Sequence, residues 1–386
     1  MHFDAKTSEY FLELLRSALH NRPAQPKPQD VSWNDLFEFA KSQSLSYMAY
    51  CAIRSSGFTL GDELEKEWTT RNLRTLVSYF NQEYECSRLC KEFSDAGIRN
   101  MPLKGSQICK LYPAPEMREM CDLDILIKPE DLERVHQMML ADDYTYIEEH
   151  TTSHNREYHK LPYLNVEVHN YLMPRENPMF SYYENYWDKV PGEDNSLTCR
   201  MSWDDCYVFM MAHTYKHFFR VGTGIRSILD IYVMREQLGD VLDRAYIVGE
   251  LQKLGILEFA ENFECLAACW FGTKKAEVPA ELQHYHYRVL ESSTYGDNSL
   301  ISKALKIMEN GKSFRTAKRR MAFTKVFPSY SYMKSKFPSL KYVPFLLPLY
   351  WVFRWIKTII KKPKRIRAFF KAWWNLSLPG TEKEGK

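Results

Sequence analysis

The sequence predicts an α+β protein in which a small mixed-sheet core is flanked by N-terminal helices and a C-terminal helical domain. Apolar residues recur at helical spacing over residues 9–95 and again after residue 203. Between residues 98 and 173, short alternating runs typical of strands replace that spacing. The chain has 386 residues, 45% of them hydrophobic and 15% aromatic, which is sufficient for two or three domains with apolar cores.

The N-terminal region, residues 1–97, is predicted to be helical. Polar breaks at "NRPAQPKPQD" and "SSGFTLGD" divide it into three helices, the last and longest from about residue 62 to 96. The first residues carry acids early and contain no uninterrupted apolar stretch, so they indicate an amphipathic helix and not a signal peptide. We therefore expect a cytoplasmic protein, and the nine scattered cysteines, without a CxxC pair, favour reduced thiols over disulfides or structural zinc.

The next region, residues 98–200, is predicted to form the α/β core. Strands are indicated by "IRNMPLKGS", "CDLDILIK", "YTYIEE" and "NVEVHNYLM". One helix, "PEDLERVHQMMLADD", follows the second strand and has Pro129 in its first turn. Helical spacing then returns in four segments between residues 203 and 272, which assigns residues 201–310 to a helical domain.

The last region, residues 311–386, is basic and rich in aromatic residues. Residues 301–386 hold 21 Lys or Arg and three acids, whereas residues 1–300 hold 31 basic and 46 acidic residues. Pro and basic residues interrupt its apolar run, so it contains no continuous stretch of about 20 apolar residues, the length needed to span a bilayer. Two interpretations stay open for residues 339–375: a peripheral helix on an anionic membrane, or a helix packed on the protein's own core.

Three acids of the α/β core are expected to converge. The period of two in a strand places Asp122 and Asp124 on one face of "CDLDILIK", and it likewise separates Glu167 and His169 from the valines of "NVEVH". Neighbouring strands would then gather three carboxylates, which require a cation. Hard oxygen ligands favour Mg²⁺ or Mn²⁺, and such a group is typical of two-metal phosphoryl transfer.

A phosphate-binding turn is predicted just upstream of the acids. Gly105 and Ser106 follow a strand and precede the short helix "SQICKLY", where backbone amides and the helix dipole favour a phosphate. Lys104 and Arg118 are expected to add positive charge to this turn, and His169 is expected to contact the nucleotide as well.

The motifs "LKGS", "CDLDILI" and "VEVH" resemble the nucleotidyltransferase superfamily of DNA polymerase beta type. More narrowly, "PLKGSQICKLYPAPEMREMCDLDILI" and "HTYKHFFRVGTGIRSILDI" resemble an uncharacterised nucleotidyltransferase family often found near bacterial polysaccharide-biosynthesis genes. The resemblance implies that Gly105 and Ser106 bind the triphosphate, that Asp122 and Asp124 bind metal, and that Glu167 is the third acid. The 15 residues between Ser106 and Asp122 exceed the general superfamily spacing and match the narrower family.

The helical domain offers further candidates. His213 and His217 share a helix face, but "HTYKH" lacks the glutamate of HExxH, so a zinc site is disfavoured against a core pair or a pair facing the nucleotide. Arg226 and Asp230 are also four residues apart, which is compatible with an ion pair on the helix surface. The resemblance instead implies that Lys216, His217, Arg226 and Asp230 lie at the mouth of the site.

The leading hypothesis is a magnesium-dependent nucleotidyltransferase that uses an NTP such as ATP. Its acceptor stays open: a sugar or sugar phosphate for a surface polysaccharide, a protein, or RNA, to which the basic aromatic tail is suited. A non-catalytic scaffold that binds nucleotide is the alternative from another class. The intact set of Asp122, Asp124 and Glu167 argues against the scaffold.

Overall fold

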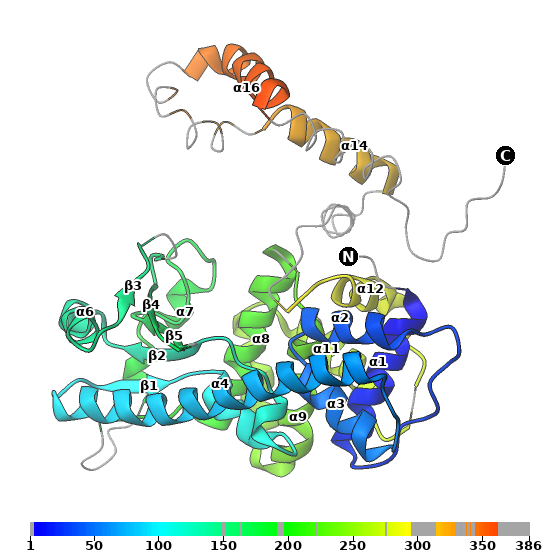
Figure 1. Cartoon of the computed structure of the whole chain (residues 1–386). Coiled ribbons are helices and arrows are strands. Elements are labelled where there is room, and N and C mark those ends of the chain that lie inside the picture. The colour runs from blue at the N-terminus through cyan, green and yellow to red at the C-terminus, as the bar shows by residue number, and fades with distance from the viewer. Residues whose placement is uncertain are drawn as a thin grey trace.

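The structure is a computed structural model, shown in Figure 1. It describes residues 4–148, 151–162, 164–190, 197–220, 222–274 and 276–294, and parts of 314–361. The mixed helix and sheet composition confirms the predicted α+β class. The sheet lies at one end of the body, and the helices formed by residues 5–55 lie at the other end (Figure 1).

The N-terminal region contains one helix more than predicted. The described residues before the sheet form α1 (Ala5–Leu19), α2 (Trp33–Ser42), α3 (Ser46–Ser55) and α4 (Asp62–Asp95). The predicted middle helix is wrong as a single element, because the chain turns at Ser44 with φ 50° between α2 and α3. Neither glycine nor proline marks this turn, so the sequence carries no strong local signal for it.

The sheet is mixed, with the strand order β1-β2-β5-β4-β3. Strand β2 is antiparallel to β1 and parallel to β5, and β4 is antiparallel to both β5 and β3. Its strands are β1 (Asn100–Pro102), β2 (Leu123–Ile127), β3 (Thr145–Tyr146), β4 (Asn155–Lys160) and β5 (Leu164–His169). Four of these strands and the helix α6 (Leu132–Ala141) confirm sequence predictions, whereas β4 was not predicted.

The two faces of the sheet differ in chemistry. One face is apolar: Leu123, Ile125 and Ile127 of β2 and Val166 and Val168 of β5 are buried in a core that α4 and α6 complete. Helix α4 runs along the sheet and contacts β1 and β5 (Figure 1). The opposite face carries the acids of β2 and β5, so hydrophobic burial on one side fixes which side chains face the other.

The helical domain shares its core with the N-terminal helices. Its predicted helices are present as α8 (Trp203–Arg220), α9 (Ile225–Leu238), α10 (Arg244–Lys253) and α11 (Leu257–Phe271), followed by α12 (Gln283–Leu290). One apolar cluster includes side chains of α1, α2 and α3 together with α8, α9 and α11. The boundaries proposed at residues 97/98 and 200/201 stay predictions.

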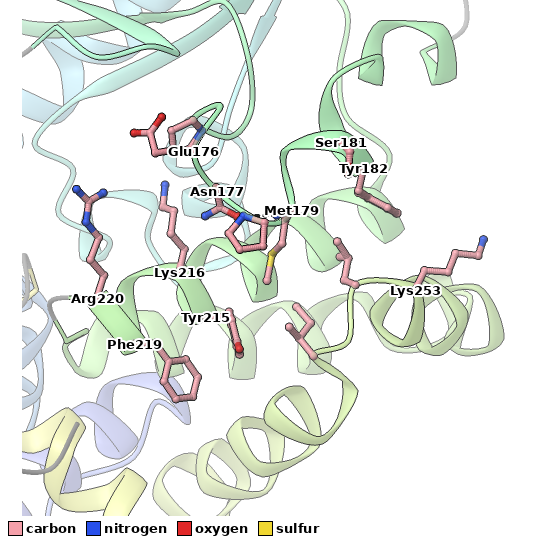
Figure 2. A pocket seen from close by; sticks show the side chains of 14 residues that line it. Glu176, Asn177, Met179, Ser181, Tyr182, Tyr215, Lys216, Phe219, Arg220 and Lys253 are labelled. Carbon is pink, nitrogen blue, oxygen red and sulfur yellow. Dashed lines mark hydrogen bonds between the residues drawn. The ribbon is translucent and has the colours of Figure 1, made fainter. Parts of the chain in front are cut away.

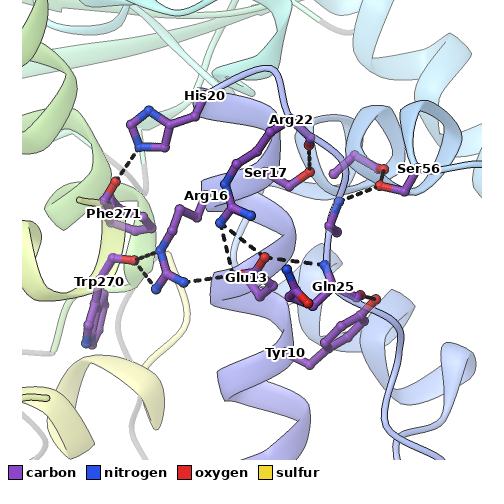
Figure 3. Close-up of polar contacts among 12 residues, drawn as sticks. Tyr10, Glu13, Arg16, Ser17, His20, Arg22, Gln25, Ser56, Trp270 and Phe271 are labelled. Atoms are coloured by element: carbon purple, nitrogen blue, oxygen red, sulfur yellow. Dashed lines mark hydrogen bonds and ion pairs between the residues drawn. The ribbon is translucent and has the colours of Figure 1, made fainter. Parts of the chain in front are cut away.

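Polar contacts also tie α1 to the end of α11, as Figure 3 shows. Arg16 donates to the Trp270 carbonyl oxygen through Nε at 3.0 Å and Nη2 at 2.7 Å, and its Nη1 pairs with Glu13. The His20 ring nitrogen Nε2 lies 2.7 Å from the Phe271 carbonyl oxygen. These contacts satisfy carbonyl groups that the last turn of a helix leaves without intrahelical donors.

The C-terminal region contains α14 (Phe314–Val326) and α16 (Leu347–Lys361), drawn apart from the body in Figure 1. In the described part of the chain, no helix has the length and apolar character needed to cross a membrane. Residues 295–313 and 362–386, which include the end of the predicted helical domain and part of the predicted membrane-binding segment, lie outside the described residues.

Candidate active site

The three predicted acids lie on one face of the sheet. Strand β5 pairs with β2 in parallel, and Asp124 is directly opposite Glu167. Asp122 immediately precedes β2, and His169 ends β5 opposite Leu126. Because paired residues on neighbouring strands project from the same face, the predicted convergence of carboxylates follows from the register.

Asp124 lies at the centre of this group and is only 5% exposed. Its Oδ1 accepts from Lys104 Nζ at 2.8 Å and lies 2.7 Å from His169 Nε2, which is also 3.3 Å from Glu167 Oε2. Burial alone would raise the pKa of Asp124, but the Lys104 charge and the bond from His169 lower it instead. Burial and the Lys104 charge would lower the pKa of His169, but its bonds to Asp124 and Glu167 raise it instead.

Asp122 has no comparable partner among the described residues. Burial, together with the neighbouring Asp124 carboxylate, raises its pKa to about 6, and the charges of Lys104 and Arg226 oppose this rise. Three carboxylates therefore face one close ammonium group, that of Lys104, and the imidazole of His169. A further cation in this group would relieve the repulsion that Asp122 experiences.

The predicted phosphate turn connects β1 to the short helix α5 (Gly105–Ile108). Lys104 has a positive φ of 47°, which turns the chain and directs its side chain toward Asp124. Ser106 Oγ donates to the Leu103 carbonyl oxygen at 2.9 Å. A Cβ at Gly105 would meet Arg118 Nη1 at 2.6 Å and Met120 Sδ at 2.7 Å, so the close packing requires glycine.

Arg118 and Asp230 form a buried cluster behind this turn. Arg118 donates to both Asp230 oxygens, from Nε at 2.7 Å and Nη2 at 2.8 Å, and Tyr112 Oη donates to Asp230 at 2.7 Å. The alternative of an Arg226–Asp230 ion pair on the helix surface is wrong, because Asp230 is 2% exposed and pairs with Arg118. The segment between Ser106 and Asp122 thus links the turn to α9.

The other candidates of the helical domain approach the acids from α8 and α9. Burial and the Lys104 charge lower the pKa of the half-buried Lys216 to about 8, and Asp124 and Glu167 oppose this shift. Arg226 Nη1 donates to the Glu119 carbonyl oxygen at 2.5 Å, and its charge acts on Asp122. The half-buried His213 and His217 have their Nε2 atoms 3.2 Å apart, and burial lowers the pKa of His217 to about 3.

Strand β4 adds residues to the site that the sequence did not indicate. Asn155 Nδ2 donates to Glu167 Oε2 at 2.8 Å, and Glu157 lies directly opposite Glu167 in the antiparallel register. The His154 ring lies 5.6 Å from that of His169, centroid to centroid. The only signal in the sequence was the alternation of Asn155, Glu157 and His159 with Arg156, Tyr158 and Lys160, which lacks an apolar face.

The group fits a divalent cation. Asp124, Glu167 and His169 each offer a ligand atom, and these atoms lie within 4.8 Å of one another. His169 Nδ1 is buried and makes no hydrogen bond with any described residue, so one ring nitrogen of this side chain has an unused bonding position. Two carboxylates and an imidazole are ligands that divalent metals accept, and Asp122 adds a third carboxylate nearby.

A family comparison agrees with this geometry. The model of a family described as uncharacterised nucleotidyltransferase matches residues 29–272, more than half of the sequence. The chain belongs to this family. It is therefore a transferase, and the match includes the turn, the acids and helices α8–α11. Among curated proteins, no match was found.

Proposed function

We propose that this nucleotidyltransferase uses Mg²⁺ and transfers a nucleoside monophosphate from an NTP, such as ATP, to a hydroxyl or phosphate acceptor. An acceptor oxygen forms a bond to the α-phosphorus, the bond from this phosphorus to the α–β bridging oxygen breaks, and pyrophosphate leaves. The main support is the excess of carboxylates over cations at Asp122, Asp124 and Glu167, next to the Gly105–Ser106 turn.

Each part of the site has a proposed role. Asp122, Asp124 and Glu167 bind the metal, which would neutralise charge on the phosphates and lower the barrier to displacement. Gly105 and Ser106 hold the triphosphate, and Lys104 supplies charge beside it. Glu167 also orients the acceptor hydroxyl or takes its proton. His169 holds Asp124 and Glu167 in place through its two contacts.

The remaining candidates lie around this centre. Lys216, His217 and Arg226 are proposed to contact the nucleotide from α8 and α9. The predicted nucleotide contact of Arg118 and Asp230 stays a prediction. Their buried pairing favours a positioning role, in which Arg118 supports Gly105 from behind.

The acid set distinguishes this proposal from a non-catalytic scaffold. The experiment incubates the protein with each labelled NTP, Mg²⁺ and cell extract, and follows transferred label and Mg²⁺-dependent NTP binding. We expect transfer by the wild type and loss of both signals in Asp122→Asn/Asp124→Asn. Arg134→Gln, an exposed substitution on α6, is the matched control. Equal binding of Mg·NTP by the double variant would refute the site, and absence of label with every NTP would favour the scaffold.

A peripheral membrane contact is proposed for the C-terminal region. Helix α16 and the turn before it expose apolar side chains, namely Phe345, Leu349, Val352 and Phe353, in a segment with a large excess of basic residues. Anionic vesicles should bind the full chain and not a variant lacking residues 339–375. Salt-sensitive RNA binding by the same segment would instead favour RNA as the acceptor.

A further inference from the structure

A pocket of about 490 Å³ lies between the segment of residues 174–182, helix α8 and the junction of α10 and α11. Lys216 lines this pocket and is also within reach of the charges of Asp124 and Glu167. Figure 2 shows Lys216 and Arg220 extending from α8 on the same side as Glu176 and Asn177, whereas Tyr215 and Phe219 extend from the opposite side of this helix. We propose that this pocket binds the acceptor, and that the acceptor is a small phosphorylated molecule with a hydroxylated ring. The assignment of an acceptor rests on the proposed function.

The position of the pocket favours the acceptor over the triphosphate. The turn with Gly105 and Ser106 follows β1, which borders β2 on one side. The segment that lines the pocket follows β5, which borders β2 on the other side and ends at His169. Phosphoryl transfer places the attacking and leaving oxygens in line on opposite sides of the phosphorus. With pyrophosphate at the turn, the attacking oxygen arrives from the side of Glu167, where the pocket lies.

Two cations of the pocket indicate an anionic group in the ligand. Lys216 and Arg220 are four residues apart on α8 and therefore share a face of the helix. Lys216 makes no ion pair with any described residue, and it is close enough to Asp124 and Glu167 for their charges to act on it. A phosphate between these two side chains would contact both cations, and Lys216, which is also proposed to contact the nucleotide, would then stand between the two substrates. Arginine and lysine both bind phosphate, and arginine does so with paired hydrogen bonds.

The remaining walls of the pocket fit a ring that carries hydroxyl groups. The rings of Tyr215 and Phe219 are 4.6 Å apart between centroids, and Met179 and Ile256 add apolar surface. An apolar wall of this kind accepts one face of a ring. Polar side chains at Asn177, Ser181 and Glu176 stand in the same pocket as partners for hydroxyl groups.

The size of the pocket distinguishes a small acceptor from a macromolecule. Its volume lies within the range of about 300–1,000 Å³ that is usual for small-molecule sites. Single-stranded nucleic acid is instead bound along an extended groove with several stacking side chains. A sugar phosphate meets all three requirements: a phosphate for the cations, a ring face for the aromatic wall, and hydroxyl groups for the polar side chains.

The test measures binding without transfer, by titration calorimetry on the full chain. The probes are glucose 1-phosphate, glucose 6-phosphate and ribose 5-phosphate, each compared with its free sugar, and Mg·ATP measured separately. At least one phosphorylated sugar should bind tenfold or more tightly than its free sugar. Arg220→Gln should weaken that binding roughly tenfold, because it removes charge-assisted hydrogen bonds to phosphate. Arg134→Gln, the exposed control on α6, should change nothing.

The outcomes separate this inference from the proposed function. Phosphorylated sugars that bind no better than free sugars would overturn it, as would RNA or peptide binding that depends on Arg220. A larger loss for Mg·ATP than for sugar phosphate in Arg220→Gln would assign the pocket to the nucleotide. If Asp122→Asn/Asp124→Asn still bound Mg·ATP while Arg220→Gln lost the sugar phosphate, the proposed metal site would fail and the pocket would stand.

Discussion

Asp124 and Asp230 are both buried carboxylates, at 5% and 2% exposed, but they differ in charge balance. Asp230 accepts two bonds from Arg118 and one from Tyr112, so one anion meets one cation. Asp124 contacts Lys104 and the imidazole of His169, but it shares these partners with two other carboxylates. The first group (Arg118, Asp230, Tyr112) is called the balanced cluster below, and the second (Asp122, Asp124, Glu167, Lys104, His169) is called the acid-rich cluster.

Charge balance distinguishes a buried ion pair that stabilises the fold from a buried charged group that serves function. A buried ion pair with all its hydrogen bonds made is costly to break but needs nothing else. A buried group with excess negative charge stores unfavourable energy that a cation would release. The main consequence of a substitution should therefore differ between the two clusters: loss of stability in the balanced one, and loss of function in the acid-rich one.

The largest effect is expected for Asp124→Asn. Turnover should fall by about a thousandfold or more, because the substitution removes a charge that holds the metal. The midpoint of thermal unfolding should fall as well, because the contacts with Lys104 and His169 that lower the pKa of Asp124 favour its charged form in the folded protein. Transfer of labelled nucleotide and thermal unfolding measure the two quantities. A folded variant with wild-type turnover would contradict the functional role of the acid-rich cluster.

Arg118→Met should produce the largest loss of stability. It leaves Asp230 buried without its cation, which typically costs about 3–5 kcal/mol in the free energy of unfolding. Denaturant unfolding measures this loss. The control is the double variant Arg118→Met/Asp230→Leu, which should recover most of the stability because no unpaired charge remains. A double variant as unstable as the single one would show that packing, not charge, explains the cost.

Asp122→Asn should stabilise the metal-free protein at high pH. Burial and Asp124 raise the folded-state pKa of Asp122 from 3.8 to about 6, so its contribution to stability is complete below pH 3.8 and is lost as the pH rises through 6. The variant should exceed the wild type by about 1–2 kcal/mol at pH 8 and equal it at pH 3. Denaturant unfolding in the presence of a chelator measures the stability difference at both pH values. An equal difference at the two pH values would contradict ionisation of the half-buried Asp122 carboxyl as the cause.

The smallest effect is expected for an ion pair outside both clusters. Lys110 Nζ lies 3.4 Å from Glu83 Oε1, and the two side chains are 50% and 40% exposed. Lys110→Gln should change the free energy of unfolding by less than about 0.5 kcal/mol, because water screens exposed pairs. Denaturant unfolding provides the measurement, and the result is the baseline against which the stability changes of the other three substitutions are compared. A loss of stability comparable to that of Arg118→Met would show that burial does not explain why the Arg118–Asp230 pair is costly to break.

The strands of the site were predictable to different degrees. Strands β2 and β5 alternate apolar residues with acids, so their faces could be assigned from the period of two. Strand β4 was not predictable by the same rule, because it lines the polar site and Tyr158 is its only large apolar residue. The contributions of Asn155 and Glu157 were missed with it. The split between α2 and α3 was missed because its turn at Ser44 contains neither glycine nor proline.

By itself, the sequence determined which residue types alternate along each strand, and thus that Asp122 and Asp124 share one face while the apolar core lies behind the other. Only the tertiary structure decided how the charges pair. Arg118 and Asp230 are 112 positions apart in the chain, and Lys104 and Asp124 lie on different elements. The energy of a charge depends on the distance to its partners and on their burial, and folding sets both between residues that are remote in sequence. For that reason, Asp230 belongs to the balanced cluster and Asp124 to the acid-rich one.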